Sequence, residues 1–194
     1  TLQNLTAKTA KDLHIRWSLY KNRLFADDNE LVATFEDAKA KTTCNSKGQA
    51  AIRQTLTVDN VAAWTAEAPN VYVVVGELMQ GKKVLETISF QTGFRTVEIK
   101  DTPASQDEFG LAGRYYYING KPVKLKGVNR HDTNPLTGKV ISREQMEHEI
   151  MLMKRANINH IRTSHYPNDP YFYYLCNKHG IYLESEANIE SHEY

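Results

Sequence analysis

Side chains suited to hydrogen bonding, cation chemistry and proton transfer are concentrated between Asn159 and Tyr194. This stretch begins with an Arg-x-x-His pair, continues through a proline-containing turn, and ends in a run in which glutamate and histidine recur. Imidazole can donate from one nitrogen and accept at the other, guanidinium offers a fixed fork of donors, and carboxylate accepts hydrogen bonds. A mixture of these groups is typical of an active-site rim, and no other part of the sequence is as dense in them.

The polar side chains of this kind follow three predicted β-strands, at residues 124–129, 159–164 and 181–188. Predicted helices at 142–157 and 170–179 separate the strands, so the strands should run parallel. Because functional groups gather beyond the carboxyl ends of parallel strands, we expect these side chains to meet at one rim. They are Asn129, Arg130, His131, Arg162, Ser164, His165, Glu186, Asn188, Glu190 and His192.

Local signals define where the two helices begin and end. Ser142 and Gln145 fit a capping box at the start of the first helix. Asp169 as N-cap, Pro170 at the first helical position and Gly180 after the last turn bracket the second helix. We therefore expect both crossover helices to be well defined.

Before residue 100 the hydrophobic periodicity is different, because apolar residues alternate with polar ones. Such a period of two predicts half-buried strands, and turn clusters between them indicate an antiparallel β-sandwich over residues 1–99. From 100 to 113 the composition shifts to proline, serine, glycine and acids, which predicts a linker. The dipeptide Asn119-Gly120 beyond it predicts a β-hairpin. The alternating segments are 12–20, 30–35, 51–58 and 70–78.

The amino-acid composition limits which binding partners and which cellular compartment are expected. The 194 residues include 24 basic and 23 acidic side chains, and the net charge of +1 provides no field that would gather nucleic acid or an anionic membrane. No apolar run approaches the roughly 20 residues that a membrane-spanning helix needs. Cys44 and Cys176 lie in unlike segments with no ligand spacing, which indicates free thiols. We expect a cytoplasmic protein that binds neither nucleic acid nor membrane.

Three segments resemble the glycoside hydrolase family 2 β-galactosidases: GVNRHDTNPLTGKV, NHIRTSHYPNDPYFYYLCNKHGIYL and EANIESH. The second fits the family signature around an Asn-x-x-Arg-x-x-His-Tyr-Pro core, and the similarity continues back through TAEAPNVY and QTGFRTVEI. The resemblance implies an immunoglobulin-like β-sandwich at 1–99, a linker at 100–113, and the first three βα units of a TIM (β/α)8 barrel at 114–194. We therefore expect an internal fragment of a larger enzyme.

The same resemblance implies roles for individual residues. His131 and His165 match two histidines that hydrogen-bond galactosyl hydroxyls and stabilise the transition state. Arg162 matches an arginine beside the nucleophile. Glu190 and His192 match two ligands of an active-site magnesium ion, and the Glu-x-His spacing on an extended segment points both side chains the same way.

Family members hydrolyse terminal β-D-galactosides such as lactose with retention, through two carboxylates about 5 Å apart. Neither carboxylate can be assigned in this sequence, because the acid/base of the family follows an Asn-Glu motif beyond Glu190. We therefore expect no turnover from the chain itself, and a homo-oligomeric parent enzyme. Two alternatives stay open at this point: a non-catalytic module that binds carbohydrate or a partner chain, and a portion of a β-glucuronidase.

Overall fold

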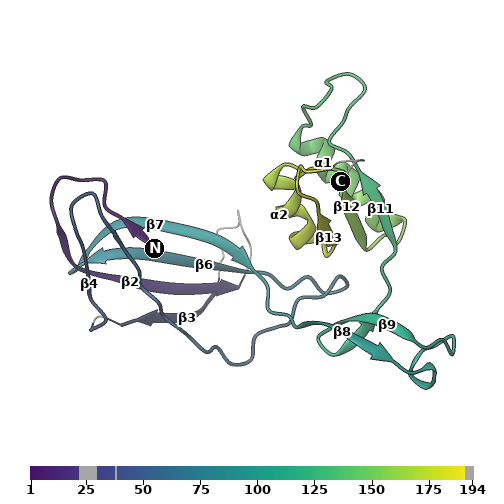
Figure 1. The fold of residues 1–194 in the computed structure, drawn as a ribbon, viewed down its shortest axis with the longest axis horizontal. Helices are drawn as coiled ribbons and strands as arrows, with labels where there is room; N and C mark the ends of the chain where they lie inside the picture. The colour runs from purple at the N-terminus through teal and green to yellow at the C-terminus, as the bar shows by residue number, and fades with distance from the viewer. Residues whose placement is uncertain (22–29, 38, 191–194) are drawn as a thin grey trace. The chain divides into compact units, whose positions relative to one another are not determined.

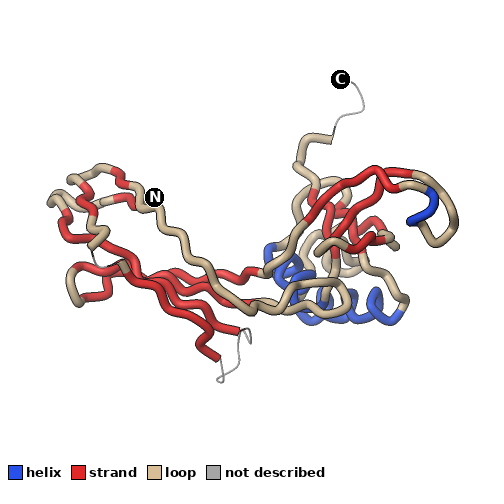
Figure 2. Tube along the Cα trace, turned by 90° about the horizontal axis from the view of Figure 1, so that it is seen from below, coloured by secondary structure: helices blue, strands red, loops and turns tan. Residues whose placement is uncertain are grey.

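The computed structural model describes residues 1–21, 30–37 and 39–190 of the chain (Figure 1). These residues form two compact units. The first comprises Thr1–Val61 and Val71–Thr92, and the second comprises Ala62–Asn70 and Gly93–Tyr194. Both α-helices lie in the second unit (Figure 2). Within the described part of the chain, no helix is long and apolar enough to span a membrane.

The first unit is built around an antiparallel sheet with strand order β3-β2-β6-β7. The third strand in space, β6, pairs with β2 from Leu13 opposite Gln80 to Lys21 opposite Tyr72. A short strand, β4, extends the sheet by pairing with the start of β2, and β1 and β5 form a separate two-stranded ribbon. The strands are β1 (Leu2–Gln3), β2 (Ala10–Lys21), β3 (Glu30–Glu36), β4 (Thr42–Cys44), β5 (Gln49–Ala50), β6 (Tyr72–Gln80) and β7 (Lys83–Thr92).

Three of the four alternating segments are strands, and the expected strand at 51–58 is wrong. Alternate residues there, Ile52 and Gln54, are half-buried, but residues 51–58 belong to no strand. The side-chain oxygen of Gln54 accepts a hydrogen bond from Trp17 Nε1 at 2.7 Å. This contact indicates that side chains such as Gln54 can be partly buried in a segment without a backbone ladder.

The second unit begins with a three-stranded antiparallel sheet of order β10-β9-β8. Its strands are β8 (Val97–Thr102), β9 (Gly113–Ile118) and β10 (Lys121–Val123). The hairpin between β9 and β10 is confirmed, because Asn119 and Gly120 both adopt positive φ, 50° and 76°, and Ile118 pairs with Lys121. Thus the β-rich region continues past residue 99, into the second unit.

The expected linker at 100–113 is instead part of this sheet and the connection inside it. Residues 100–102 end β8, and Gly113 begins β9, which pairs directly with β8. Between them, Asp107 accepts hydrogen bonds from the backbone N–H groups of Phe109 (2.9 Å) and Leu111 (3.2 Å). These bonds lower the pKa of Asp107 below its usual range. An acid- and glycine-rich composition therefore marks an ordered turn here rather than a domain boundary.

Three parallel strands with two crossover helices complete the second unit, as the sequence predicted. The sheet has order β11-β12-β13, and its register aligns Gly127 with His160 and His160 with Tyr182. One helix follows each of the first two strands. The elements are β11 (Gly127–Arg130), α1 (Arg143–Arg155), β12 (His160–Thr163), α2 (Pro170–His179) and β13 (Tyr182–Ser185).

A compact apolar core fixes the helices against this sheet. Ile150, Ile161, Phe172 and Leu175 are fully buried in it. The predicted caps are present: the Ser142 hydroxyl accepts from Gln145 N, Asp169 accepts from Tyr171 N, and Gly180 ends α2 in the left-handed conformation. The side chain of Gln145 does not complete the capping box, because its Oε1 accepts from Asn134 Nδ2 at 2.6 Å instead. Core and caps together hold the strand ends, where the polar residues lie.

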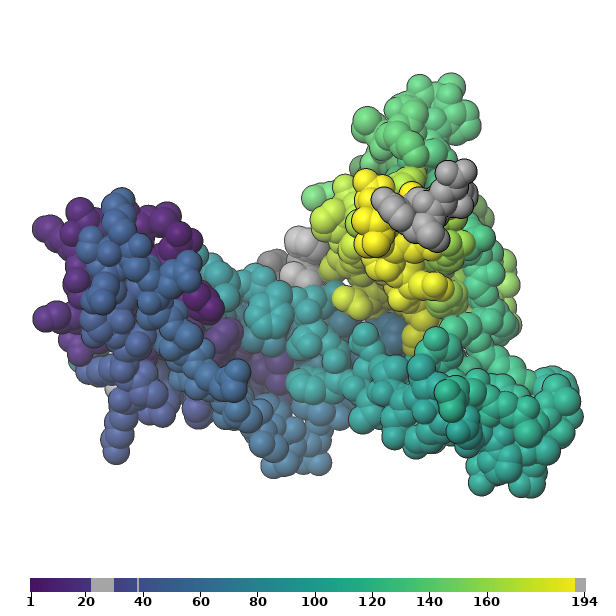
Figure 3. Space-filling view, viewed as in Figure 1, coloured from purple at the N-terminus to yellow at the C-terminus, as the bar shows by residue number. Residues whose placement is uncertain are grey.

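The loop between β11 and α1 stands out from the second unit as a green projection (Figure 3). Its tip is closed by reciprocal backbone hydrogen bonds between Asn134 and Gly138, at 2.8 and 2.9 Å. Leu136 at this tip is 93% exposed. The loop carries His131 and Asp132 at its base, so its anchoring bears directly on the predicted rim.

Candidate active site

The predicted rim exists at the carboxyl ends of β11, β12 and β13. His131 directly follows β11, His165 lies two residues beyond β12, and Glu186 directly follows β13. The three parallel strands are adjacent in the sheet, so their ends bring these residues together.

An arginine, a glutamate and a histidine form the centre of the rim. The Arg162 guanidinium contacts Glu186 Oε1 through both Nε and Nη2. The other oxygen of Glu186, Oε2, lies 3.1 Å from His165 Nδ1. The backbone N–H of Glu186 donates to Thr163 Oγ1 at 3.1 Å. Glu186 is therefore held by two elements at once: its carboxylate by a cation and an imidazole, and its backbone by the end of β12.

If the His165 ring is neutral, its contact with Glu186 favours the tautomer that carries the proton on Nδ1. A carboxylate only accepts hydrogen bonds, so the proton of the neutral imidazole belongs on Nδ1, facing Glu186. The contact of 3.2 Å between Nδ1 and Arg162 Nη2 is then not a hydrogen bond, since both atoms are donors. The remaining ring nitrogen, Nε2, is left as an acceptor. His165 is thus prepared to receive a hydrogen bond from a hydroxyl group.

The second predicted histidine lies beside the first. The ring centroids of His131 and His165 are 5.6 Å apart, with the planes at 68° to each other. The ring of Tyr166 lies 6.1 Å from that of His131. The His131 side chain is exposed, so the pair presents two imidazoles from different strands at an open rim.

One of the two predicted metal ligands reaches this cluster. Glu190 Oε2 lies 3.6 Å from His165 Nδ1, and the side chain is 40% exposed. His192 lies outside the described residues, so the Glu-x-His pair cannot be measured. Among residues 1–21, 30–37 and 39–190, no group of three or more histidine, cysteine, aspartate or glutamate side chains is arranged to hold a metal ion. The carboxylate oxygens of Glu190 have the hard-donor chemistry that Mg²⁺ prefers, and this is the part of the predicted site that fits.

Other residues predicted at the strand ends differ in their surroundings. Asn129 and Asn188 are exposed. Ser164 is buried, and its backbone N–H donates to Arg130 O at 2.9 Å. Arg130 is itself buried and faces away from the exposed rim into a polar network with Asp132. The strand ends therefore supply an exposed layer, which includes His131, and a buried layer beneath it.

Sequence reasoning named Glu186 as a strand-end residue but did not recognise it as the partner of Arg162. The parallel register offers the missing signal, because Arg162 lies opposite Glu184 and Glu186 is two residues further along the same face. Tyr166 was also missed, although it directly follows His165. Both residues complete the surroundings of His165 and His131.

Comparison with known protein families identifies the class of this fold and rim. The family model described as "Glycosyl hydrolases family 2" matches residues 7–95, and "Glycosyl hydrolases family 2, TIM barrel domain" matches residues 110–194. The chain belongs to glycosyl hydrolase family 2. It combines the immunoglobulin-like domain of that family with a portion of its TIM barrel.

The relatives with high sequence identity carry one name. A β-galactosidase of Photobacterium profundum is 44% identical over 140 residues, which is 72% of this chain and 12% of that protein. A β-galactosidase of Pectobacterium atrosepticum is 35% identical over 192 residues, covering 97% of this chain and 17% of that protein. The chain thus spans less than a fifth of the length of these relatives.

Solved structures similar in fold carry more than one name. A Bacteroides uniformis β-glucuronidase superimposes with a TM-score of 0.78 at 25% identity, covering 96% of this chain and 20% of that one. A putative β-galactosidase from Bacteroides fragilis gives the same TM-score at 19% identity, over 95% of this chain and 25% of that one. At 19% identity, the similarity to the Bacteroides fragilis structure supports the fold alone.

Proposed function

We propose that the chain forms one wall of the active site of a retaining β-galactosidase, where it positions a terminal β-D-galactoside such as lactose. The observation that carries this proposal is the meeting of His131 and His165, from separate strands, with ring centroids 5.6 Å apart. Relatives named β-galactosidase at 44–45% identity over about 70% of the chain support the choice of substrate. The three parallel strands then correspond to the first three of the barrel.

The two imidazoles suit neighbouring hydroxyl groups of a sugar ring. His165 presents Nε2 as an acceptor because Nδ1 faces Glu186. His131 lies beside it with an exposed ring that can donate or accept. Hydrogen bonds that strengthen as the ring distorts towards an oxocarbenium ion would stabilise the transition state.

The residues that break the glycosidic bond are proposed to lie outside this sequence. A retaining mechanism needs one carboxyl group as acid/base and a second as nucleophile, about 5 Å apart. Neither Glu186 nor Glu190 follows an asparagine, as the acid/base of the family does, and nothing in the family pattern makes either glutamate catalytic. We therefore propose that the 194-residue polypeptide alone does not hydrolyse β-galactosides.

We also propose that Glu190 and His192 would hold a magnesium ion in the complete enzyme. The ion would supply a fixed positive charge and bound water beside the rim. Within this chain, Glu190 would contribute a hard oxygen ligand, while a histidine ligand is tolerated rather than preferred by Mg²⁺. A homo-oligomeric parent enzyme working in the cytoplasm is part of the same proposal.

A β-glucuronidase portion is the second candidate, because β-glucuronidase structures share the fold at a TM-score of 0.78. Such an enzyme must bind the carboxylate of a uronate, for which a free cation is suited. The guanidinium of Arg162 is already paired with Glu186. Arg162 would therefore not supply that cation, and a uronate site would have to come from residues outside this sequence.

A chimeric enzyme tests the proposal. The segment of the Pectobacterium atrosepticum β-galactosidase aligned with this chain is replaced by the corresponding residues of this chain. We expect the chimera to hydrolyse a chromogenic β-galactoside, and His165→Gln to lower its kcat/KM by about a hundredfold. His148→Gln is the matched control, because His148 is exposed on α1 away from the strand ends. A chimera that instead cleaves the corresponding β-glucuronide, or neither glycoside, contradicts the proposal.

A further inference from the structure

A buried guanidinium lies next to the first sugar-binding histidine. Arg130 ends β11 and is only 5% exposed, although its side chain is charged. Its Nε donates to Glu149 Oε2 in α1 at 2.9 Å. Its Nη1 donates to Asn168 Oδ1 at 2.6 Å and also to Asp132 Oδ1. One side chain thus contacts a helix and two separate loops.

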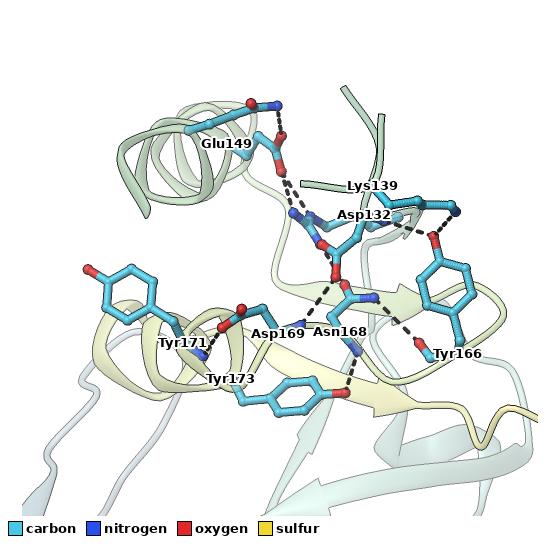
Figure 4. A network of polar contacts seen from close by, with 10 residues as sticks. Asp132, Lys139, Glu149, Tyr166, Asn168, Asp169, Tyr171 and Tyr173 are labelled. Atoms are coloured by element: carbon cyan, nitrogen blue, oxygen red, sulfur yellow. Dashed lines mark hydrogen bonds and ion pairs between the residues drawn. The ribbon is translucent and has the colours of Figure 1, made fainter. Parts of the chain in front are cut away.

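Further hydrogen bonds join those two loops to each other (Figure 4). The backbone N–H of Asp132 donates to Tyr166 Oη at 3.1 Å, and that of Asp169 donates to Asp132 Oδ2 at 3.2 Å. The hydroxyl of Tyr173, in α2, accepts from the backbone N–H of Asn168 at 2.8 Å. Lys139 Nζ donates to Tyr166 Oη at 2.7 Å. The loops after β11 and β12 are therefore cross-linked around Asp132 and Asn168.

These two loops carry the two histidines of the rim. Arg130 and Asp132 are the immediate neighbours of His131 in the chain. On the other loop, His165 lies three residues before Asn168. A guanidinium that fixes Asp132 and Asn168 relative to each other consequently fixes the distance between the two imidazoles.

Stability alone does not call for this arrangement. Burying a guanidinium with carboxylates is costly, and apolar side chains of similar volume pack as well or better in many proteins. The apolar core already holds α1 and α2 to the sheet through Ile150, Ile161 and Phe172. The planar fork of arginine, in contrast, meets several acceptors at fixed angles, which lysine cannot do.

We propose that Arg130 is a positioning residue, which sets the separation and orientation of His131 and His165 without contacting the sugar. The inference rests on the proposed role of these histidines in binding a galactoside. Its structural part, the dependence of the imidazole pair on Arg130, can be measured without any substrate.

The test uses the 194-residue chain with isotope-labelled histidine and methyl groups, followed by NMR. We expect a nuclear Overhauser cross-peak between the rings of His131 and His165, which Arg130→Lys removes while the methyl signals of Ile150 and Ile161 stay in place. Unchanged core signals separate positioning from a general loss of structure. Arg143→Lys is the control, because the Arg143 guanidinium lies over the Tyr171 ring at 4.7 Å, outside these contacts.

Should Arg130→Lys fail to fold, Asn168→Ala removes the acceptor on the second loop and leaves the pairs of Arg130 with Asp132 and Glu149. The cross-peak is expected to be lost in this variant too. A cross-peak retained in a folded variant, or absent from the wild type, overturns the inference. Titration with D-galactose gives a separate readout: if it moves neither histidine signal in the wild type, the proposed sugar site fails, and the cross-peak still decides the role of Arg130.

Discussion

Replacing Gly180 by alanine should be among the most destabilising single-methyl changes in the second unit. Gly180 ends α2 with φ of 72°, and its N–H donates to Cys176 O. A Cβ added there would lie 2.2 Å from Ala66 O and 2.8 Å from Ala66 C. Because both of these are backbone atoms, no side-chain rotation can relieve the clash. Lys154 Nζ also binds the carbonyl oxygens of Ala66 and Gly180, at 3.0 and 3.2 Å, so separating the two segments strains that contact as well.

Gly120 provides a matched control for the magnitude. It has a similar φ of 76°, but an added Cβ would meet nothing within 4 Å. Gly120→Ala should therefore cost only the left-handed strain of about 1–2 kcal/mol. Gly180→Ala carries the same strain plus an overpacking cost of about 1–3 kcal/mol. The expected difference between the two variants is thus about 1–3 kcal/mol.

Urea unfolding of the two variants measures this difference. Trp64 lies in the second unit, with its Nε1 donating to Asn177 O at 2.9 Å, and its fluorescence can report that unit alone in a Trp17→Phe background. We expect a lower unfolding midpoint for Gly180→Ala than for Gly120→Ala, with unchanged m-values. Equal midpoints would refute the steric argument, because the two glycines would then differ only in backbone strain.

Three further predictions concern a thiol, a histidine and an ion pair. Burial raises the pKa of Cys176 to about 12, so its thiol should react with a disulfide reagent at pH 8 only as fast as the chain unfolds. As a control, the thiol of Ser46→Cys, at an exposed turn, should react at once. Equally fast labelling of the two thiols would contradict this prediction. Burial also lowers the pKa of His160 below the usual value for histidine of about 6.5, so the unfolded chain binds the proton more readily. The contribution of His160 to the free energy of unfolding should be constant above about pH 6.5 and decrease below it. In urea titrations at several pH values, His160→Gln should make this decrease smaller. An unchanged dependence on pH would contradict the prediction. A double-mutant cycle on Arg162→Gln and Glu186→Gln should give a coupling of about 0.5–3 kcal/mol in urea unfolding, and additive effects would contradict their pairing.

Structural features that depend on only a few neighbouring residues could be predicted from the sequence. The Asn119-Gly120 hairpin and the ends of α2 at Asp169 and Gly180 depend on backbone preferences and on bonds within one turn. The convergence of His131 and His165 was also predictable, since parallel strands bring their carboxyl ends to one edge.

Features that depend on contacts distant in sequence were not predictable. The alternation in residues 51–58 is satisfied by side-chain burial, such as that of Gln54 against Trp17, and carries no information about a pairing strand. Residues 100–113 have the composition of a linker, yet β8 continues to Thr102 because its backbone pairs with β9 as far as Thr102 opposite Gly113. Likewise, the three partners of Arg130 are brought together only by the folded loops and helix.

We propose that the ends of β11 and β12 bind a neutral galactosyl group through His131 and His165. This binding can be measured by titrating the isotope-labelled chain with D-galactose, and separately with D-glucuronate, while following the histidine ring signals. We predict that galactose shifts the signals of both residues in a saturable way and leaves exposed His148 unmoved. Signals that respond to glucuronate but not to galactose, or to neither sugar, would contradict the claim.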